Sequence, residues 1–445
     1  MNPLAGPGDS LSLLCLFLIL LTPLAGAGMA LLFTGFSRSR NAAHAIFSAL
    51  CILAVAAVVY YAVGFSLVSF PGRGGVSLYI HGKSWNLIGN DALFFHGLRF
   101  DGSPVNLAAL LQMFAVGVAA LIPLGAGCGR WRLHSILLST ALLAGLTYPI
   151  FAHWVLGGGW LAQLGENLGL GRGFLDTGGA STIHVLGGLT ALSIAWILRP
   201  RHGRFLSDGM PTALPAHNVV YLLLGCVLAL PGWIGLNAAG AILYHGATAP
   251  RVALIAVNTL LSAAAAALAS AAFTRWRFGK PDASLSANGW IGGLVAASAG
   301  CAFVDPFTAL LTGVVAGFLV PLMAVVLESR LEIDDPGGTI SAHAVAGIWG
   351  LLAAGLFARF PVLTGAGTSA LEGAHADGQF LAQLAGVATL LGFVLPFSYG
   401  LNFLLNRISP QRASKQQEHE GMDLGELGAG AYPEFLTRTN DFGGM

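Results

Sequence analysis

Charge is what this 445-residue sequence has least of: only 9% of its residues are charged, while 55% are hydrophobic. A soluble domain carries about 25% charged residues, so the chain lacks the polar surface that a soluble enzyme of its size needs. Its 21 basic and 20 acidic residues nearly cancel, which leaves no basic field for nucleic acid. These deficits exclude a soluble enzyme, a nucleic-acid-binding protein and a disordered chain, and they predict an integral membrane protein.

Cysteine is also scarce, because the chain has only five. All five lie in apolar segments, far apart and without the C-x-x-C spacing of a redox or zinc site. They are interpreted as small buried residues, and no disulfide, metal or cofactor is expected. The five are Cys15, Cys51, Cys128, Cys226 and Cys301.

Long apolar stretches, by contrast, are abundant. A membrane-spanning helix needs roughly 20 predominantly apolar residues. Eleven stretches meet that criterion, at about 12–36, 42–69, 106–128, 133–155, 179–198, 217–243, 252–274, 286–304, 306–327, 340–358 and 379–406. The first could be a secretory signal peptide, but it lacks a basic n-region and a convincing cleavage site, so it is predicted to be a helix. The glycines inside these stretches predict close helix packing.

The basic residues between the stretches predict an orientation. With the amino terminus outside, 15 of the 21 Lys and Arg residues lie in inner loops and the tail, and six lie outside. Cytoplasmic loops carry the basic excess, so this orientation is favoured, and an odd number of spans places the tail in the cytoplasm. The sequence therefore predicts an all-α integral membrane protein of the cell membrane, with a transmembrane domain over 1–408 and a cytoplasmic tail over 409–445.

One pattern occurs twice and places two histidines. Residues 176–188 read DTGGASTIHVLGG, and residues 335–347 read DPGGTISAHAVAG. In each copy an Asp at a helix start is followed eight residues later by a His, about 12 Å deeper at 1.5 Å per residue. That depth is near the middle of a hydrocarbon core about 30 Å thick. The two copies enter from opposite faces, so His184 and His343 are predicted to meet.

Opposite entry of the two copies favours the inverted-repeat architecture of many transporters. Five helices at about 12–200 and five at about 217–360 form the predicted repeats, and the helix at about 379–406 remains as an eleventh. A pair of neutral imidazoles at the meeting point gives a narrow path one donor and one acceptor for a small polar molecule. The alternative for each histidine is a structural hydrogen bond to a neighbouring carbonyl. A metal site is not favoured, because no Cys, Asp or Glu shares the predicted depth.

The two aspartates that begin the pattern have a simpler interpretation. A carboxylate at a helix N-terminus caps free N–H groups and complements the helix dipole. Capping is therefore predicted for both Asp176 and Asp335. For Asp176, a contribution to the electrostatics of the outer mouth is a second interpretation.

Several further stretches complete an ordered set along the chain. They are Gly28–Arg40, Phe114–Ala115, Leu146–Trp160, Asp176–Gly188, Trp233–Ala238, Asn288–Pro306 and Asp334–Gly350. Together they resemble the ammonium transporter family (Amt/Mep/Rh), and the resemblance runs from about residue 12 to residue 432. So many matches in one order are specific for this family.

The resemblance implies a homotrimer of eleven-helix protomers, each with its own pore for ammonium or ammonia. In the family, ammonium is attracted at an outer vestibule and loses a proton, and ammonia then passes a phenylalanine gate and two histidines. Carried over by position, His184 and His343 are the pore pair, and Phe114 is the outer gate residue. Asp176 is the helix-five aspartate that is important for activity.

Three positions depart from the family pattern at the outer vestibule. Leu156 stands where the family has a tryptophan, Leu236 replaces the second gate phenylalanine, and Gly240 stands where a serine is expected. A cation on a tryptophan face gains roughly 0.5–2 kcal/mol, and leucine offers none. These changes weaken the prediction of high-affinity ammonium capture. Trp160 is interpreted either as a replacement aromatic face or as an interfacial anchor.

The departures keep two other functions open. One is a Rh-like low-affinity channel for ammonia or another small neutral molecule such as carbon dioxide, and the other is a non-transporting ammonium sensor. An enzyme is not expected, because no nucleophile–base–acid set is visible at one depth. Residues 420–432 resemble the family's cytoplasmic motif, which implies a PII-type signal protein as partner, although Leu427 and Ala429 replace the motif's His and Glu.

Overall fold

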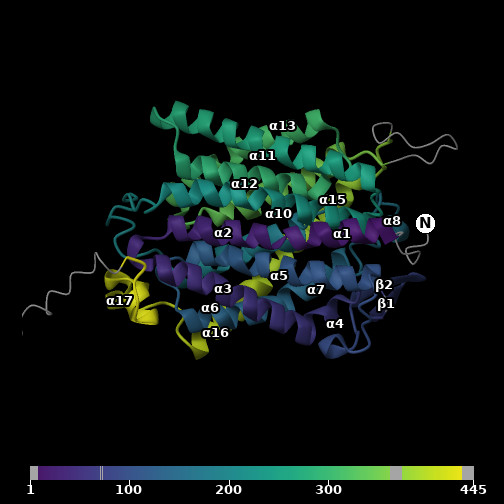
Figure 1. Ribbon diagram of the computed structural model, residues 1–445, viewed down its shortest axis with the longest axis horizontal. Coiled ribbons are helices and arrows are strands. Elements are labelled where there is room, and N and C mark those ends of the chain that lie inside the picture. Colours follow the sequence, from purple (N-terminus) through teal and green to yellow (C-terminus); the bar gives the residue numbers. More distant parts are fainter. Residues whose placement is uncertain (1–8, 71, 73, 361–372, 433–445) are drawn as a thin grey trace, which may run out of the picture.

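The chain folds as a bundle of long helices that run side by side along the molecule (Figure 1). The computed structural model describes residues 9–70, 72, 74–360 and 373–432. The start of α1 (Asp9–Leu21) and the strands β1 (Val76–Ile80) and β2 (Lys83–Ile88) lie at one end of the bundle, here named the hairpin end. The helix α17 (Lys415–Glu420) lies at the opposite end, here named the tail end.

Ten helical stretches of the described residues are long and apolar enough to cross a membrane. They are Ser10–Phe36, Ser39–Val68, Pro104–Gly127 (α5), Leu133–Val155, Ala180–Leu198, Val219–His245 (α10), Ala249–Phe278 (α11), Pro306–Leu331 (α13), Ile340–Phe357 and Gln379–Ile408. Each agrees with one of the predicted spans to within a few residues at its ends.

Several of these stretches combine α-helices with other turns. Their α-helices are α2 (Pro23–Phe36), α3 (Ala42–Val59), α4 (Phe65–Val68), α6 (Leu133–Leu142), α7 (Tyr148–Val155), α9 (Leu186–Leu198), α14 (Ala346–Phe357), α15 (Gln379–Thr389) and α16 (Leu395–Ile408). Their π turns are η2 (Tyr60–Gly64), η4 (Leu143–Thr147), η5 (Ala180–Val185), η6 (Ile340–Val345) and η7 (Leu390–Val394). Shorter helical turns are η1 (Ser39–Asn41), η3 (Leu93–Phe95), α8 (Leu164–Leu168) and η8 (Asp423–Leu427).

The predicted span at 286–304 forms the helix α12 (Ala283–Gly300), which is not among the ten. Its serines, Asn288 and glycines lower its hydropathy. It packs against α11, α13 and α14, and every residue from Ile291 to Gly300 is buried. A helix enclosed by protein needs little apolar surface facing lipid, so its composition fits its position.

The first predicted span, at about 12–36, is divided into two helices. Thr22 separates α1 from α2, and its Oγ1 hydroxyl donates a hydrogen bond to the Ile19 carbonyl at 2.7 Å. Pro23 begins α2, where its missing N–H costs nothing because the first helical N–H groups have no intrahelical partner. Thr22 keeps a helical backbone conformation, so Ser10–Phe36 is one membrane-crossing stretch of 27 residues, and the prediction of one span is confirmed.

The all-α prediction is wrong in one detail, because residues 76–88 form a two-stranded hairpin. The strands β1 and β2 pair antiparallel. His81 and Gly82 join them with φ angles of +51° and +75°. Positive φ at both positions is what a two-residue hairpin turn requires. The hairpin caps one end of the helical bundle and leaves the membrane-crossing part helical.

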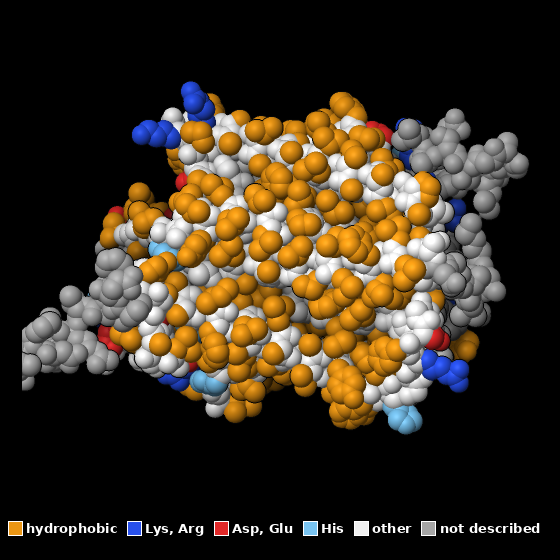
Figure 2. Space-filling model, in the orientation of Figure 1, with side chains coloured by type: hydrophobic (Ala, Val, Ile, Leu, Met, Phe, Trp, Pro, Cys, Tyr) orange, Lys and Arg blue, Asp and Glu red, His pale blue; other side chains and the backbone are white. Residues whose placement is uncertain are grey.

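The lateral surface of the bundle is apolar. Hydrophobic side chains cover the middle of the visible face, whereas charged side chains and histidines lie mainly toward its two ends (Figure 2). Large exposed side chains include Phe17, Leu50, Val227, Leu268 and Phe318. Helices with satisfied backbone groups and apolar outer faces are what a lipid bilayer accepts, so the chain is a multi-pass membrane protein.

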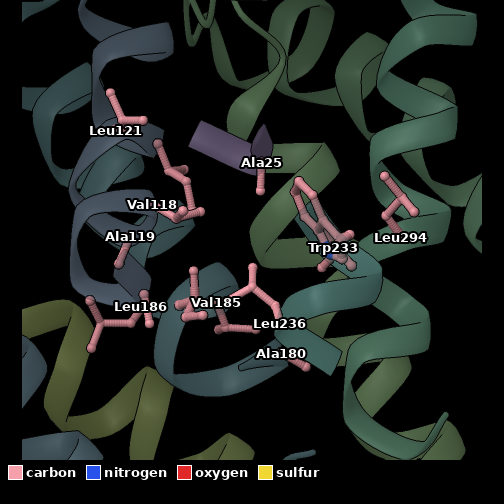
Figure 3. Close-up of a cluster of buried hydrophobic side chains, with 14 of the residues drawn as sticks. Ala25, Val118, Ala119, Leu121, Ala180, Val185, Leu186, Trp233, Leu236 and Leu294 are labelled. Carbon is pink, nitrogen blue, oxygen red and sulfur yellow. The ribbon is translucent and has the colours of Figure 1, made fainter. Parts of the chain in front are cut away.

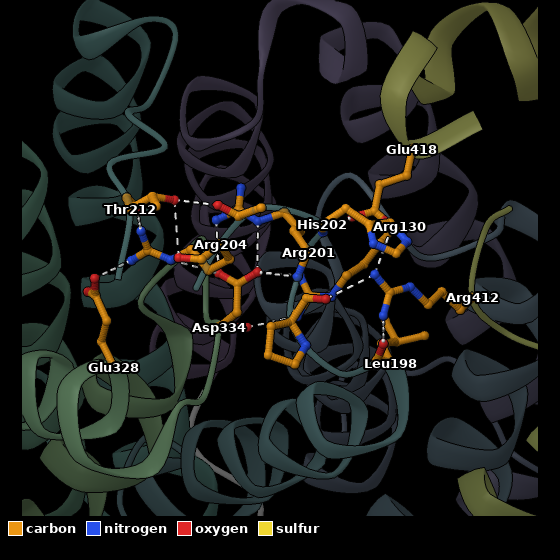
Figure 4. A network of polar contacts seen from close by, with 12 residues as sticks. Arg130, Leu198, Arg201, His202, Arg204, Thr212, Glu328, Asp334, Arg412 and Glu418 are labelled. Atoms are coloured by element: carbon orange, nitrogen blue, oxygen red, sulfur yellow. Dashed lines mark hydrogen bonds and ion pairs between the residues drawn. The ribbon is translucent and has the colours of Figure 1, made fainter. Parts of the chain in front are cut away.

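A buried carboxylate organises the tail end of the bundle (Figure 4). Asp334 accepts hydrogen bonds from Arg201 Nε and Nη2 at 2.8 and 2.9 Å, and Arg130 and Arg204 each approach it within 3.5 Å. Burial by itself raises the pKa of Asp334, but Arg130 and Arg201 outweigh burial and hold that pKa well below its ordinary value. The ion cluster fixes the connection that leads into η6.

The tail is tied to the same cluster. Glu418 of α17 accepts hydrogen bonds from Arg412 Nη2 at 2.9 Å and from the His202 backbone N–H at 2.6 Å. Arg412 also donates to the Leu198 and Pro200 carbonyls, at 2.8 and 2.9 Å. Residues 409–420 therefore pack onto the loop that follows α9.

Candidate functional site

The two copies of the repeated pattern adopt matching local structures. Each places its aspartate at the start of a π turn, η5 after Asp176 and η6 after Asp335. The Asp176 carboxylate accepts hydrogen bonds from the backbone N–H groups of Gly179, Ala180, Ser181 and Thr182 and from the Ser181 hydroxyl. The Asp335 carboxylate accepts from the Thr339 hydroxyl and the Ile340 N–H. This is the geometry that the capping prediction describes for both residues.

The histidines of the two copies face each other in the interior. The Nδ1 atoms of His184 and His343 lie 3.4 Å apart, and the ring centroids are separated by 5.4 Å. Both residues are buried, and the His184 ring also stacks on Trp233 with centroids 4.7 Å apart and planes inclined by 10°. Neutral rings in this arrangement share one hydrogen bond between their Nδ1 atoms, so one Nε2 is left as a donor and the other as an acceptor.

Small residues let the two histidine segments approach. A Cβ on Gly188 would lie 2.5 Å from the Ala344 nitrogen, and a Cβ on Gly347 would lie 2.6 Å from Val185 Cγ2. Gly188 and Gly347 occupy the same position in the two copies, and each contacts the residue after the other copy's histidine. A larger side chain at either position would push the rings apart.

The π turns are embedded in the hydrophobic core. Ala180, Val185, Trp233 and Leu236 gather there with side chains of α5 and α12 (Figure 3). In this surrounding, His184 Nε2 is buried and has no hydrogen-bond partner among the described residues. An unpaired imidazole nitrogen in a dry interior is available to a small polar molecule that passes it.

A small cavity lies beside the first turn of η5, between α5, α7 and α10. Its volume is about 20 Å³, which is room for one molecule of the size of water or ammonium. The lining residues are Leu111, Gln112, Ala115, Tyr148, Leu156, Thr177, Gly178, Gly179, Thr182, Ile183, Leu236, Gly240 and Tyr244. The predicted vestibule positions 156, 236 and 240 are thus brought together, one helical turn from His184.

Similarity to known proteins extends over nearly the whole chain. The model of the Ammonium Transporter Family matches residues 11–432. The chain belongs to that family. It is 35% identical to the ammonium transporter Amt2 of Archaeoglobus fulgidus over 96% of this chain and 88% of the relative.

Two solved structures extend the comparison. A protein described as a sensor Amt protein has a TM-score of 0.82 and 26% identity, over 94% of this chain and 98% of that one. Mep2 of Saccharomyces cerevisiae has a TM-score of 0.78 and 27% identity, over 93% and 91% of the two chains. The fold of this Ammonium Transporter Family chain therefore follows Amt and Mep proteins over nearly its whole length.

The predicted outer gate residue Phe114 and the vestibule residue Trp160 are not among the residues that line the cavity of this family member. α5 presents Ala115 to the cavity, and Phe114, one residue earlier, is half-buried against other apolar side chains. Phe114 is not among the residues that line this small cavity, and its assignment as the outer gate remains a prediction. The Trp160 ring lies 5.9 Å from the Trp154 ring and is not part of the lining of this cavity.

Gly240 has a structural reason to differ from the expected serine. A Cβ at this position would overlap the Thr177 carbonyl oxygen, which belongs to the segment that leads into η5.

We expect Gly240→Ser to destabilise the protein by about 1–3 kcal/mol, as overpacking of a core does, and not to restore a serine site. Thermal unfolding of the purified protein in detergent measures this. Gly400→Ser is the control, because no described atom outside its own helix lies within 4 Å of that added Cβ; equal unfolding temperatures for the two variants would contradict the expectation.

Sequence reasoning missed the polar residues of the cavity. The Tyr60 hydroxyl donates to Gln112 Oε1 at 2.5 Å, and Gln112 Nε2 donates to the Tyr244 hydroxyl oxygen at 3.1 Å. The Tyr148 hydroxyl is buried and has no hydrogen-bond partner in the described part of the chain. Gln112 within a predicted span was an available signal, because polar side chains in membrane-crossing helices are costly and are default candidates for function.

Proposed function

We propose that this chain transports ammonium by holding it at the cavity and passing ammonia along the histidine pair. The contact between the buried His184 and His343 rings at 3.4 Å carries the proposal. An unpaired ammonium ion in an apolar interior costs many kcal/mol, whereas neutral ammonia needs only hydrogen bonds. The ring pair offers those hydrogen bonds without a fixed charge, which favours ammonia as the species that crosses.

The proposal includes the architecture that the family resemblance implies. The ten long helices and α12 form eleven spans, with inverted repeats at about 12–200 and 217–360 within a domain over 1–408. The amino terminus lies outside and the tail over 409–445 lies in the cytoplasm. Three copies assemble into a homotrimer through part of the exposed apolar surface, and a PII-type signal protein contacts the tail.

Ammonium-driven current is the test of this function. In proteoliposomes on a solid-supported membrane, we expect ammonium chloride to give a current in the wild-type protein. Leu156→Trp adds an aromatic face beside the cavity and is expected to lower the half-saturating ammonium concentration about 2- to 30-fold. Leu138→Trp, on an exposed position of α6, is the control and should leave the half-saturating concentration unchanged.

A low-affinity channel for neutral molecules is the second candidate, and the apolar Leu156 and Leu236 in the cavity lining favour it. It predicts no ammonium current in the wild-type protein, together with gas flux in stopped-flow measurements. A current in Leu156→Trp alone would decide for this candidate. Ammonium binding without any flux in either assay would instead indicate a sensor.

A further inference from the structure

A second cavity, here named the tail pocket, lies at the tail end between the tail and the bundle. Its volume is about 620 Å³, which is within the range of cavities that bind small organic molecules. One wall comes from η1 and from the residues just before α10, and the other comes from the tail from the end of α17 onward. It shares no lining residue with the cavity beside η5, and it has room for a ligand much larger than ammonium.

Two contacts hold the tail wall of this pocket against the bundle. The Asp423 carboxylate accepts hydrogen bonds from the backbone N–H groups of Ala43 and His44, at 3.2 and 2.8 Å, and so caps the start of α3. Gly421 has a φ of +109°, and a Cβ at this position would lie 2.5 Å from the Arg40 carbonyl oxygen. The glycine therefore lets the tail backbone approach η1 closely. Both walls are fixed by the fold, so the pocket is preformed when the tail is docked.

The Arg40 guanidinium is the group in this pocket that most needs an explanation. Arg40 is the only Lys or Arg among the lining residues. Its Nε atom is buried and has no hydrogen-bond partner among the described residues, and Arg40 takes part in none of their ion pairs. Buried polar groups are nearly always paired with protein, water or a ligand. The donors of a guanidinium match the oxygens of a phosphate or carboxylate, so an anionic group in the pocket supplies the missing acceptor.

The two acidic residues of the lining, Asp423 and Glu420, do not neutralise Arg40. Both Asp423 oxygens accept N–H groups at the start of α3, where the negative charge complements the helix dipole. Glu420 is exposed at the end of α17, and its carboxylate accepts a hydrogen bond from Gln416 Nε2 at 2.9 Å. No ion pair joins Glu420 to Arg40 in the described part of the chain. Arg40 is therefore left to recognise an anion that enters from solvent, with Glu420 as a nearby competitor.

The pocket also presents two flat rings, those of His217 and Tyr432. His217 Nδ1 donates a hydrogen bond to the Ser37 carbonyl at 2.9 Å, and its Nε2 accepts one from the Tyr432 hydroxyl at 3.2 Å. These bonds fix the tautomer of the imidazole and hold the two ring centroids 6.0 Å apart. Both residues line the pocket and are partly exposed in it. A ring face of this kind is a platform for a planar heterocycle, and stacking of a base on it is worth about 1–3 kcal/mol.

We propose that the tail pocket binds a nucleoside phosphate, with the phosphate on Arg40 and the base against the His217 and Tyr432 rings. An unpaired guanidinium, two ring faces and a volume of about 620 Å³ together match this class of molecule. The ligand contacts the tail and the bundle at once, so its binding stabilises the docked tail. The site is independent of the proposed ammonium transport, because its residues do not line the cavity beside η5.

Calorimetric titration of the purified full-length protein in detergent tests the site, with adenosine monophosphate (AMP), adenosine and inorganic phosphate as probes at equal ionic strength. AMP should bind, and should raise the unfolding temperature of the protein. Adenosine and inorganic phosphate each carry part of the ligand and should bind about tenfold or more weakly than AMP. Arg40→Gln should weaken AMP binding about tenfold or more and leave adenosine binding unchanged, because only the charged hydrogen bonds are lost. Arg330→Gln, at an exposed position near the end of α13, is the matched control.

Two further substitutions separate recognition from folding. Glu420→Gln removes the competing carboxylate and should tighten AMP binding, which a damaged fold would not do. Tyr432→Leu removes a ring face and should weaken AMP and adenosine binding but leave phosphate binding unchanged. No AMP binding by the wild type at millimolar concentration, equal AMP affinity in the wild type and Arg40→Gln, or equal binding of AMP and inorganic phosphate would each overturn the site. Ammonium-driven current is measured without nucleotide, so these outcomes leave the transport proposal standing.

Discussion

Replacing either His184 or His343 by alanine is expected to lower ammonium-driven flux about 5- to 150-fold. Each substitution removes one partner of the 3.4 Å ring contact and leaves the other imidazole unpaired in a buried site, a loss of about 1–3 kcal/mol. The path then lacks the paired donor and acceptor that a neutral molecule needs. Methylammonium uptake and ammonium-induced current in proteoliposomes measure the effect.

His96→Ala is the control for the pair, because His96 is exposed near the hairpin end. Its flux should equal that of the wild type. Unchanged flux and unchanged selectivity in both pore variants would contradict the role assigned to the pair. A change in selectivity at constant flux would indicate that the pair lines the path and selects the molecule that crosses, without setting the rate.

Asp334→Asn is expected to destabilise the protein by about 3–5 kcal/mol, which is the second large effect. The wild-type carboxylate lies against Arg130, Arg201 and Arg204, and the Arg130 side chain is 0% exposed. Removing the negative charge leaves a buried guanidinium without its counterion. Thermal unfolding of the purified protein in detergent measures the loss. Glu328→Gln is the matched control, because its side chain is 36% exposed and its pair with Arg204 is worth less than about 1 kcal/mol.

The same carboxylate gives a dependence on pH with a definite sign. The pKa of Asp334 is lowered in the folded protein, so its stabilisation is complete above the unfolded value of about 4. That stabilisation is lost as the pH falls below about 4 toward the folded-state pKa. The unfolding temperature of the wild type should therefore fall more steeply in this pH range than that of Asp334→Asn. Parallel curves for the two proteins would show that the cluster does not depend on the charge of Asp334.

The spans could be predicted from sequence because lipid imposes a simple rule on composition and length. Stretches of about 20 apolar residues marked the ten long helices, and the same criterion found α12. The hairpin at 76–88 was missed. A hairpin with only five paired positions is a weak signal within a long connection.

The meeting of the histidines was also predictable, since two copies of one pattern fix two equivalent positions. The closeness of the rings was not, because it depends on Gly188 and Gly347 packing against the opposite copy. Motif matching gives a position along α5 but not which of its side chains line a cavity, and here Ala115 does so. The assignment of Phe114 as a gate remains a prediction.

The tyrosines of the cavity lay beyond sequence reasoning. Tyr148 and Tyr244 are far apart in the chain, and aromatic residues with polar tips are common near membrane surfaces. Only the folded arrangement shows that they converge on one space with Gln112. Residues that differ from a family pattern therefore require a structure before a lost function is inferred.

The π turns η5 and η6 make the direction of both histidines depend on the number of residues in their segments. A π turn accommodates one residue more than the α-helix around it, and such bulges are frequent at functional sites. His184 and His343 lie inside these turns, so their direction depends on a local excess of one residue in each half. Loss of a single codon in either segment would straighten the helix and rotate the imidazole away from its partner, even though every side chain that remained was unchanged.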